Sequence, residues 1–133
     1  KRNVEHTLMN WEVYPSSIYE ALKRLHSYKG IKEIIITENG AAFADEYLNN
    51  EINDENRKYY LQNHIYKVLQ AKEEGVNVKG YFVWTLLDNF EWAEGYRPRF
   101  GLVYVDFKTQ RRIIKSSGAW YSSFLKNASI MFT

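Results

Sequence analysis

The chain has 133 residues, no Cys and a formal net charge of +2, from 18 Lys and Arg against 16 Asp and Glu. This balance gives no indication of a nucleic-acid or anionic-membrane partner, and the absence of Cys excludes disulfides, thiolate metal sites and a Cys nucleophile. The 3 His lack the spacing of zinc ligands, so we expect no metal and no other cofactor.

The ends of the chain give two further expectations. Lys1-Arg2-Asn3 is not followed by a signal-peptide core, and every apolar run is far below the roughly 18 residues needed to cross a bilayer. We therefore expect a soluble protein with no membrane partner. The chain does not begin with Met, which indicates an internal or processed amino end.

The amino-terminal third predicts a loop and then a helix. Residues 1–14 show no periodicity, and Pro15 favours a helix start. Ser17 and Glu20 have the spacing of a capping box, and Gly30 would end the helix. One face of this helix is apolar, at Ile18, Leu22 and Leu25.

A strand is predicted over Ile31–Thr37, and Glu38 and Asn39-Gly40 follow it directly. Its three consecutive isoleucines favour a parallel strand with both faces covered. A carboxylate at the carboxyl end of such a strand occupies the place where (β/α) barrels carry catalytic groups. From the local pattern alone, Glu38 in solvent before an ordinary turn is an equally good interpretation.

The middle of the chain predicts a surface loop over residues 41–56, which are polar and rich in acids. Asp54 would cap a long helix that ends at Gly75. The buried stripe of this helix would be Leu61, Ile65, Val68 and Leu69. His64 lies beside that stripe, and we interpret it as a helix-packing residue.

The carboxy-terminal third predicts a second strand over Val78–Thr85, which would form a βαβ unit with the first. Residues 101–114 favour two short antiparallel strands with a polar turn. Ser116 or Ser117 would cap a final helix, and the tail from Asn127 is expected to fray.

Two segments resemble the carboxy-terminal part of the family 1 glycoside hydrolases, the β-glucosidases and their relatives. One is Ile34 to Ala42, which contains Thr-Glu-Asn-Gly, and the other is Trp84-Thr85-Leu86-Leu87-Asp88-Asn89-Phe90-Glu91-Trp92. The resemblance runs from about Met9 to Leu125. Two positions depart from the family: Asn10 stands where relatives commonly have Gly, and Ile114 stands where they often have Pro.

This resemblance implies an α/β fold, the C-terminal portion of a (β/α)8 TIM barrel with about two barrel strands, three helices and a β-hairpin. A complete TIM barrel needs roughly 200 residues or more. We therefore expect residues 1–133 to be a C-terminal fragment of a glycoside hydrolase catalytic barrel.

The resemblance also implies that Glu38 is the catalytic nucleophile, because it matches the Glu of the Thr-Glu-Asn-Gly motif. Retaining hydrolysis needs a second carboxyl group about 5 to 5.5 Å away, which acts as acid and base. The family supplies that group from an Asn-Glu-Pro motif, which this sequence does not contain. We expect the chain to be inactive alone.

Five further residues match the family's sugar site. Trp84 matches the indole that stacks on the sugar, Glu91 the carboxylate that accepts from the 4- and 6-hydroxyls, and Trp92 the donor to the 3-hydroxyl. Phe100 matches an aromatic residue of the pocket wall, and Trp11 one that borders the leaving-group side. Without the motif, core packing would explain both Trp84 and Trp92 better.

We expect the chain to function as part of a retaining β-glycosidase that acts on terminal β-D-glucosides or galactosides. Relatives that act on 6-phospho sugars replace the Glu91-Trp92 pair with small or polar residues, so an unphosphorylated substrate is expected. The expected partner is the missing amino-terminal part of the barrel, or a second copy of the chain. Two alternatives are a noncatalytic carbohydrate-binding unit and a structural protein whose strand edges pair with another chain.

Overall fold

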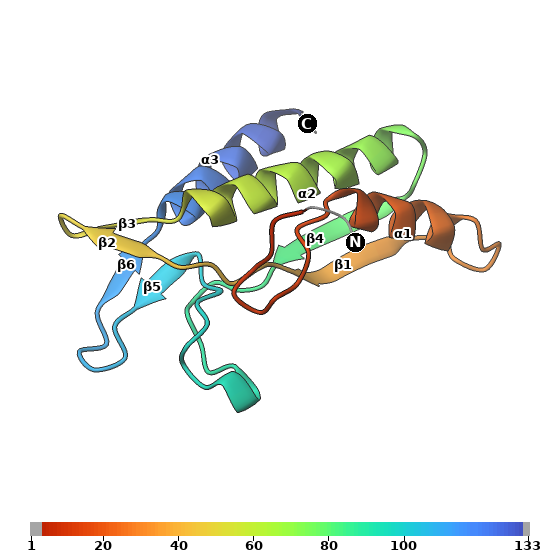
Figure 1. The fold of residues 1–133 in the computed structure, drawn as a ribbon. Helices are drawn as coiled ribbons and strands as arrows, with labels where there is room; N and C mark the ends of the chain where they lie inside the picture. Colours follow the sequence, from red (N-terminus) through yellow and green to blue (C-terminus); the bar gives the residue numbers. More distant parts are fainter. Residues whose placement is uncertain (1–3, 132–133) are drawn as a thin grey trace.

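The computed structural model describes residues 4–131, which form one helical layer over a small parallel sheet. Helices α1 (Ser16–His26), α2 (Glu55–Glu73) and α3 (Ser116–Met131) lie together, with α2 and α3 side by side in Figure 1. The sheet consists of β1 (Ile34–Asn39) and β4 (Val78–Val83), which pair in parallel. The predicted βαβ unit is confirmed.

The core lies between the helices and one face of this sheet. Its buried residues form two clusters, which share contacts with Tyr81 of β4. The larger cluster contains Ala41, Phe43, Tyr60, Leu61, Ile65 and Leu102, and the smaller contains Leu22, Val68, Ala71, Val76 and Val78. The predicted apolar stripe of α2 supplies Leu61, Ile65 and Val68 to these clusters.

The opposite face of the sheet is open, contrary to the expectation that β1 is covered on both sides. Ile35 is 50% exposed and Phe82 of β4 is 59% exposed. Strand β1 also starts three residues later than predicted and includes Glu38. Its open face is the one that alternates away from the helices, because successive side chains of a strand point to opposite faces.

Helix α1 lacks the predicted capping box. Pro15 is its N-cap residue and makes no side-chain cap, whereas the Ser17 hydroxyl donates to the carbonyl of Tyr14. Helix α1 ends at His26, four residues before Gly30, with Ser27 as its C-cap residue. The chain then forms tight turns instead of further helix, because the Tyr28 N–H donates to the Leu25 carbonyl and the Ile31 N–H donates to the Tyr28 carbonyl.

Residues 41–56 are exposed over most of their length, as predicted for a surface loop, but they are neither exposed nor irregular throughout. They begin with Ala41, Ala42 and Phe43, which are buried, and continue as a hairpin of β2 (Glu46–Leu48) and β3 (Glu51–Asn53). The prediction was based on polar composition, but the side chains of the acids Asp45 and Asp54 of this segment are buried because basic residues outside it neutralise them.

Asp54 occupies the N-cap position of α2 but does not cap that helix. Its carboxylate accepts hydrogen bonds from the backbone N–H of Ser117 at 2.8 Å and from the Ser116 hydroxyl at 2.7 Å. Asp54 therefore caps α3, and the prediction that a Ser side chain does so is wrong. Helix α3 extends through Met131, and the last two residues of the tail that is expected to fray lie outside the described residues.

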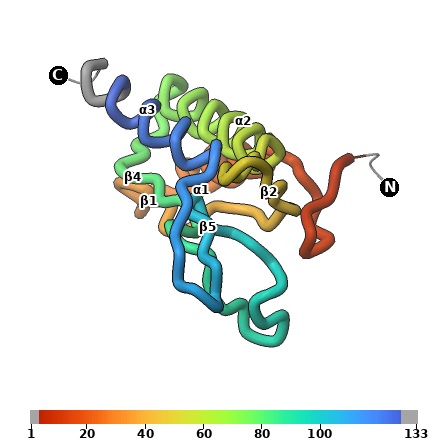
Figure 2. Tube along the Cα trace, turned by 90° about the vertical axis from the view of Figure 1, so that its left-hand side faces the viewer, coloured from red at the N-terminus to blue at the C-terminus, as the bar shows by residue number. Residues whose placement is uncertain are grey.

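The predicted carboxy-terminal hairpin is confirmed as β5 (Val103–Val105) paired antiparallel with β6 (Arg112–Ile114). A long segment between β4 and β5 contains the short 3-10 helix η1 (Trp92–Glu94). Figures 1 and 2 both show this segment projecting away from the helical layer. It comes directly after the carboxyl end of β4, beside the carboxyl end of β1.

Candidate active site

A cavity of about 570 Å³ lies at the carboxyl ends of β1 and β4. All six residues predicted for the site line it, together with three others; the nine are Trp11, Glu38, Asn39, Gly40, Tyr60, Trp84, Glu91, Trp92 and Phe100. The structure thus brings together residues that lie up to 89 positions apart in the sequence, from Trp11 to Phe100. Sequence reasoning missed Tyr60, which comes from the first turns of α2.

The two strand ends that carry Glu38 and Trp84 are tightly fitted to each other. A Cβ atom on Gly40 would lie 1.7 Å from the Trp84 carbonyl oxygen, so only glycine fits at this position. The Trp84 N–H donates to the Asn39 carbonyl at 2.9 Å. These contacts fix the backbone on the carboxyl side of Glu38.

Asn39 also ties this strand end to the core through its side chain. Its Nδ2 donates to the Tyr60 hydroxyl at 3.3 Å, and its Oδ1 accepts from the Tyr81 hydroxyl at 2.7 Å. Burial raises the pKa of both tyrosines above the ordinary value, which already lies well above neutral pH, so both hydroxyls are protonated. Glu38, by contrast, has an exposed side chain that faces the cavity.

Glu91 is held by two donors that meet at one oxygen. Its Oε1 accepts from Trp84 Nε1 at 3.2 Å and from Asn89 Nδ2 at 2.6 Å. The indole N–H of Trp84 is therefore directed at Glu91, and both side chains line the cavity. Asn89 was not predicted as a site residue, and no sequence signal beyond its position in the second motif marks it.

The remaining aromatic residues differ in exposure. Trp92 is 85% exposed and Trp11 is 52% exposed, whereas Phe100 is buried. Trp11 packs on Phe100 with ring centroids 6.0 Å apart. Trp92 has a φ of 44°, in the left-handed region that a bulky residue rarely adopts. Such strained residues cluster at functional sites.

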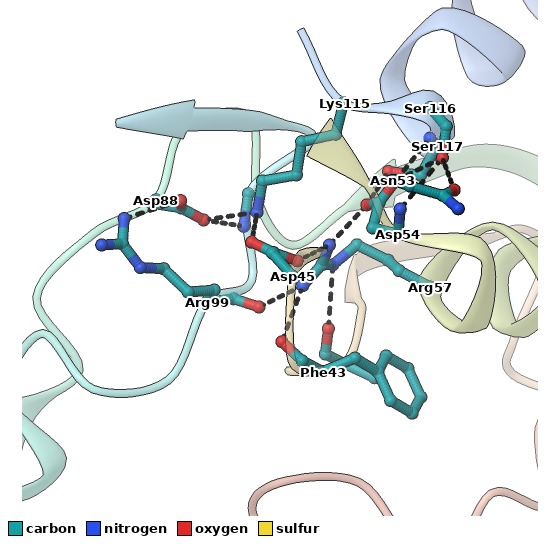
Figure 3. Close-up of polar contacts among 12 residues, drawn as sticks. Phe43, Asp45, Asn53, Asp54, Arg57, Asp88, Arg99, Lys115, Ser116 and Ser117 are labelled. Atoms are coloured by element: carbon teal, nitrogen blue, oxygen red, sulfur yellow. Dashed lines mark hydrogen bonds and ion pairs between the residues drawn. The ribbon is translucent and has the colours of Figure 1, made fainter. Parts of the chain in front are cut away.

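A buried ionic network supports the segment that carries Glu91 (Figure 3). Asp88, three residues before Glu91, accepts from the Gly101 N–H at 2.9 Å, from Arg99 Nη1 at 2.9 Å and from Lys115 Nζ at 2.8 Å. Lys115 also donates to Asp45 at 2.6 Å. The projecting segment is thereby joined to the residue that follows β6 and to the segment that follows β1.

Arg57 of α2 extends the same network to the other side of the site. Its guanidinium pairs with Asp45 at 2.8 Å and with Asp54, and it donates to the carbonyls of Ala41 and Arg99. Burial and the nearby Arg57 charge lower the pKa of Lys115, while Asp45 and Asp88 act in the opposite direction. The network balances three acids with three bases.

Among residues 4–131, no group of three or more His, Cys, Asp or Glu side chains could hold a metal ion. No helix within that range is long and apolar enough to span a membrane.

Comparisons with known proteins agree on one family. The family model for "Glycosyl hydrolase family 1" matches residues 1–130. The "1,4-beta-D-glucan glucohydrolase" of Thermotoga neapolitana is 54% identical over 96% of this chain, and the chain spans 29% of that relative's length. A "6-phospho-beta-galactosidase" of Streptococcus mutans is 41% identical over 96% of the chain, which corresponds to 28% of the relative.

The structure leads to the same family. It superposes on the family 1 β-glucosidase of Thermotoga maritima with a TM-score of 0.92 at 52% identity, covering 96% of this chain and 29% of that one. Structures of that relative have been solved in complex with glucoimidazole and with galacto-hydroximolactam. The chain therefore belongs to glycoside hydrolase family 1 and corresponds to the carboxy-terminal part of its TIM barrel.

Proposed function

We propose that the chain is part of a retaining β-glycosidase that hydrolyses terminal β-D-glucosides or β-D-galactosides. In this proposal it contributes the nucleophile and part of the site that holds the terminal sugar. The observation that carries the proposal is the cavity, which brings Glu38 and Glu91 together with Trp84, Trp92 and Phe100.

Glu38 is proposed as the nucleophile. An exposed carboxylate on a fixed strand end can attack the anomeric carbon and form a glycosyl ester, which water then hydrolyses. The sugar oxygen that leaves must receive a proton from a second carboxyl group. We propose that an amino-terminal segment of the barrel supplies that group, and that the chain is inactive without it.

The other lining residues would bind the terminal sugar. Glu91 is proposed to accept hydrogen bonds from the 4- and 6-hydroxyls, since charge-assisted hydrogen bonds are about twice as strong as neutral ones. Trp84 would stack on the apolar face of the sugar, and Trp92 would donate to the 3-hydroxyl. Phe100 would close the wall of the pocket, and Trp11 would border the leaving-group side.

The proposed partner of the chain is the amino-terminal part of the barrel. Ile35 and Phe82 leave one face of the parallel sheet open, and the chain spans 29% of the relatives' length. This chain joined to amino-terminal barrel strands that carry an Asn-Glu-Pro motif would form the complete barrel. Self-association of the chain is the competing arrangement.

Active-site labelling tests the proposal. A slow 2-fluoro β-glucoside should form a covalent adduct with the complete barrel, and mass spectrometry should locate it on Glu38. Glu38→Gln should still bind sugar but lose nearly all turnover, because an amide cannot form the glycosyl ester. An adduct on any other residue would remove Glu38 from the nucleophile role.

A further inference from the structure

We infer that Asn89 is a positioning residue for Glu91, and that it sets how strongly the site discriminates sugars at their outer hydroxyl and hydroxymethyl groups. This inference rests on the proposed role of Glu91 as the ligand of the 4- and 6-hydroxyls. Nothing in the second motif distinguishes Asn89 from a solvent-facing turn residue, so the geometry alone carries the argument.

The orientation of the Asn89 amide is determined by its neighbours. Its Nδ2 donates to Glu91 Oε1 at 2.6 Å and to the Phe90 carbonyl at 3.2 Å. Both partners are acceptors, so the group that faces them must be the NH2 group. The reversed amide would place Oδ1 against a carboxylate and a carbonyl, where it could make no hydrogen bond.

This orientation leaves the other end of the Asn89 amide without a partner. Oδ1 is buried, and no hydrogen-bond donor reaches it from residues 4–131. A buried acceptor without a partner is unfavourable, and natural proteins retain few of them. Within residues 4–131, the Asn89 amide thus uses its NH2 group for Glu91 and Phe90 and makes no hydrogen bond through its carbonyl oxygen.

The contact with Asn89 also gives the two oxygens of Glu91 different roles. Both protein donors, Asn89 Nδ2 and Trp84 Nε1, meet at Oε1. Oε2 is then the oxygen that can receive hydroxyl groups of a sugar. Without Asn89, only the longer contact of 3.2 Å to Trp84 Nε1 would orient the carboxylate.

Asn89 can resist movement of Glu91 because the residue before it is anchored. Asp88 is buried and accepts from the Gly101 N–H and from Lys115 Nζ. The backbone at residues 88–89 is thus fixed to the hairpin of β5 and β6 rather than to Glu91 itself. The hydrogen bond from Asn89 Nδ2 then holds the Glu91 carboxylate in place relative to this fixed backbone.

The test compares two substrates in the complete barrel. Nitrophenyl β-glucoside carries the hydroxymethyl group that Glu91 would bind, and nitrophenyl β-xyloside lacks it. Asn89→Ala should lower kcat/KM for the glucoside about 10-fold, as expected for loss of one charge-assisted hydrogen bond, and lower that for the xyloside by less than about 3-fold. Asn89→Asp should lower the glucoside value further, because it sets a second carboxylate against Glu91.

The glucoside-to-xyloside ratio does not depend on how much enzyme is folded, so a folding defect cannot imitate the expected result. Asn63→Ala is the matched control, because among residues 4–131 the Asn63 amide donates to the Tyr59 carbonyl within α2 and to no other group. This control should leave the ratio unchanged.

Combination with Glu91→Gln separates the two hypotheses. If Glu91→Gln leaves the ratio unchanged, the proposed role of Glu91 is wrong. If Glu91→Gln lowers the ratio while Asn89→Ala reduces both substrates equally, Glu91 keeps its role and the positioning role of Asn89 is wrong. A double variant whose ratio matches that of Glu91→Gln alone would support the inference, because Asn89 would then act only through Glu91.

Discussion

Lys115 allows a quantitative test of the buried ionic network. It is fully buried and lies 2.6 Å from an Asp45 oxygen and 2.8 Å from an Asp88 oxygen. Lys115→Met would keep most of the side-chain volume but leave two buried carboxylates short of one cation. Each carboxylate retains another partner, Arg57 for Asp45 and Arg99 for Asp88.

Removing one partner of a buried ion pair costs about 3 to 5 kcal/mol. Because both acids keep a second cation, we expect the lower end of this range for Lys115→Met, about 3 kcal/mol. The free energy of unfolding can be measured by urea titration of the complete barrel with Trp fluorescence as the signal. Lys58→Met is the matched control, since the partly exposed Lys58 pairs with the exposed Glu55 and should contribute at most about 1 kcal/mol.

A double variant shows whether the loss arises from uncompensated charge. Asp88→Asn combined with Lys115→Met restores the balance of charge, so the pair should cost less than the sum of the single variants, by about 1 kcal/mol or more. Equal effects of Lys115→Met and Lys58→Met, or strict additivity with Asp88→Asn, would refute the view that charge compensation holds this network together.

Three further predictions concern pH, substrate and assembly. Burial lowers the pKa of His64 below its usual range near 6.5, so the unfolded state binds a proton first as the pH falls. The contribution of neutral His64 to the free energy of unfolding should therefore be fully present above about pH 6.5 and should decline as the pH falls toward the lower folded pKa. His64→Gln should lack this part of the decline in urea titrations. The complete barrel should show higher kcat/KM for nitrophenyl β-glucoside than for its 6-phosphate, because a phosphate of about −1.5 to −2 charge would face Glu91; a preference for the phosphate would remove Glu91 from its proposed role. Alone, the chain should associate or aggregate because Ile35 and Phe82 lie open on a two-stranded sheet, and a sharp, cooperative thermal transition of a monomer at micromolar concentration would contradict this.

The elements that could be predicted are those whose pattern is local. The consecutive isoleucines of β1 and the apolar stripe of α2 identify a strand and a helix without any knowledge of the rest of the chain. The turn between β5 and β6 is likewise marked by its own polar residues. Of the lining residues predicted for the site, Glu38, Trp84, Glu91 and Trp92 lie in the two motifs, whereas Trp11 and Phe100 were matched through the wider resemblance. Their prediction therefore depended on the resemblance rather than on periodicity.

The elements that could not be predicted depend on distant partners. Asp45 has the same local sequence character as a surface acid, yet its partner Lys115 lies 70 positions away. Asp54 follows the local rule for a helix cap, but its carboxylate instead accepts from the N–H of Ser117, 63 positions away. Local rules give the right residue type here and the wrong partner, because tertiary contacts compete for the same oxygens.

The two carboxylates of the site share Trp84 but otherwise depend on different contacts, and this difference has a chemical consequence. Glu38 depends on the fit of Gly40 against Trp84 and on the hydrogen bonds of Asn39. Glu91 depends on Asn89 and, through Asp88, on the buried network. Disturbing the network should thus alter sugar discrimination before it alters attack at the anomeric carbon, since Glu38 shares none of those ionic contacts. Retaining hydrolysis tolerates such a division, because recognition of the outer hydroxyls and attack at the anomeric carbon involve different parts of the sugar.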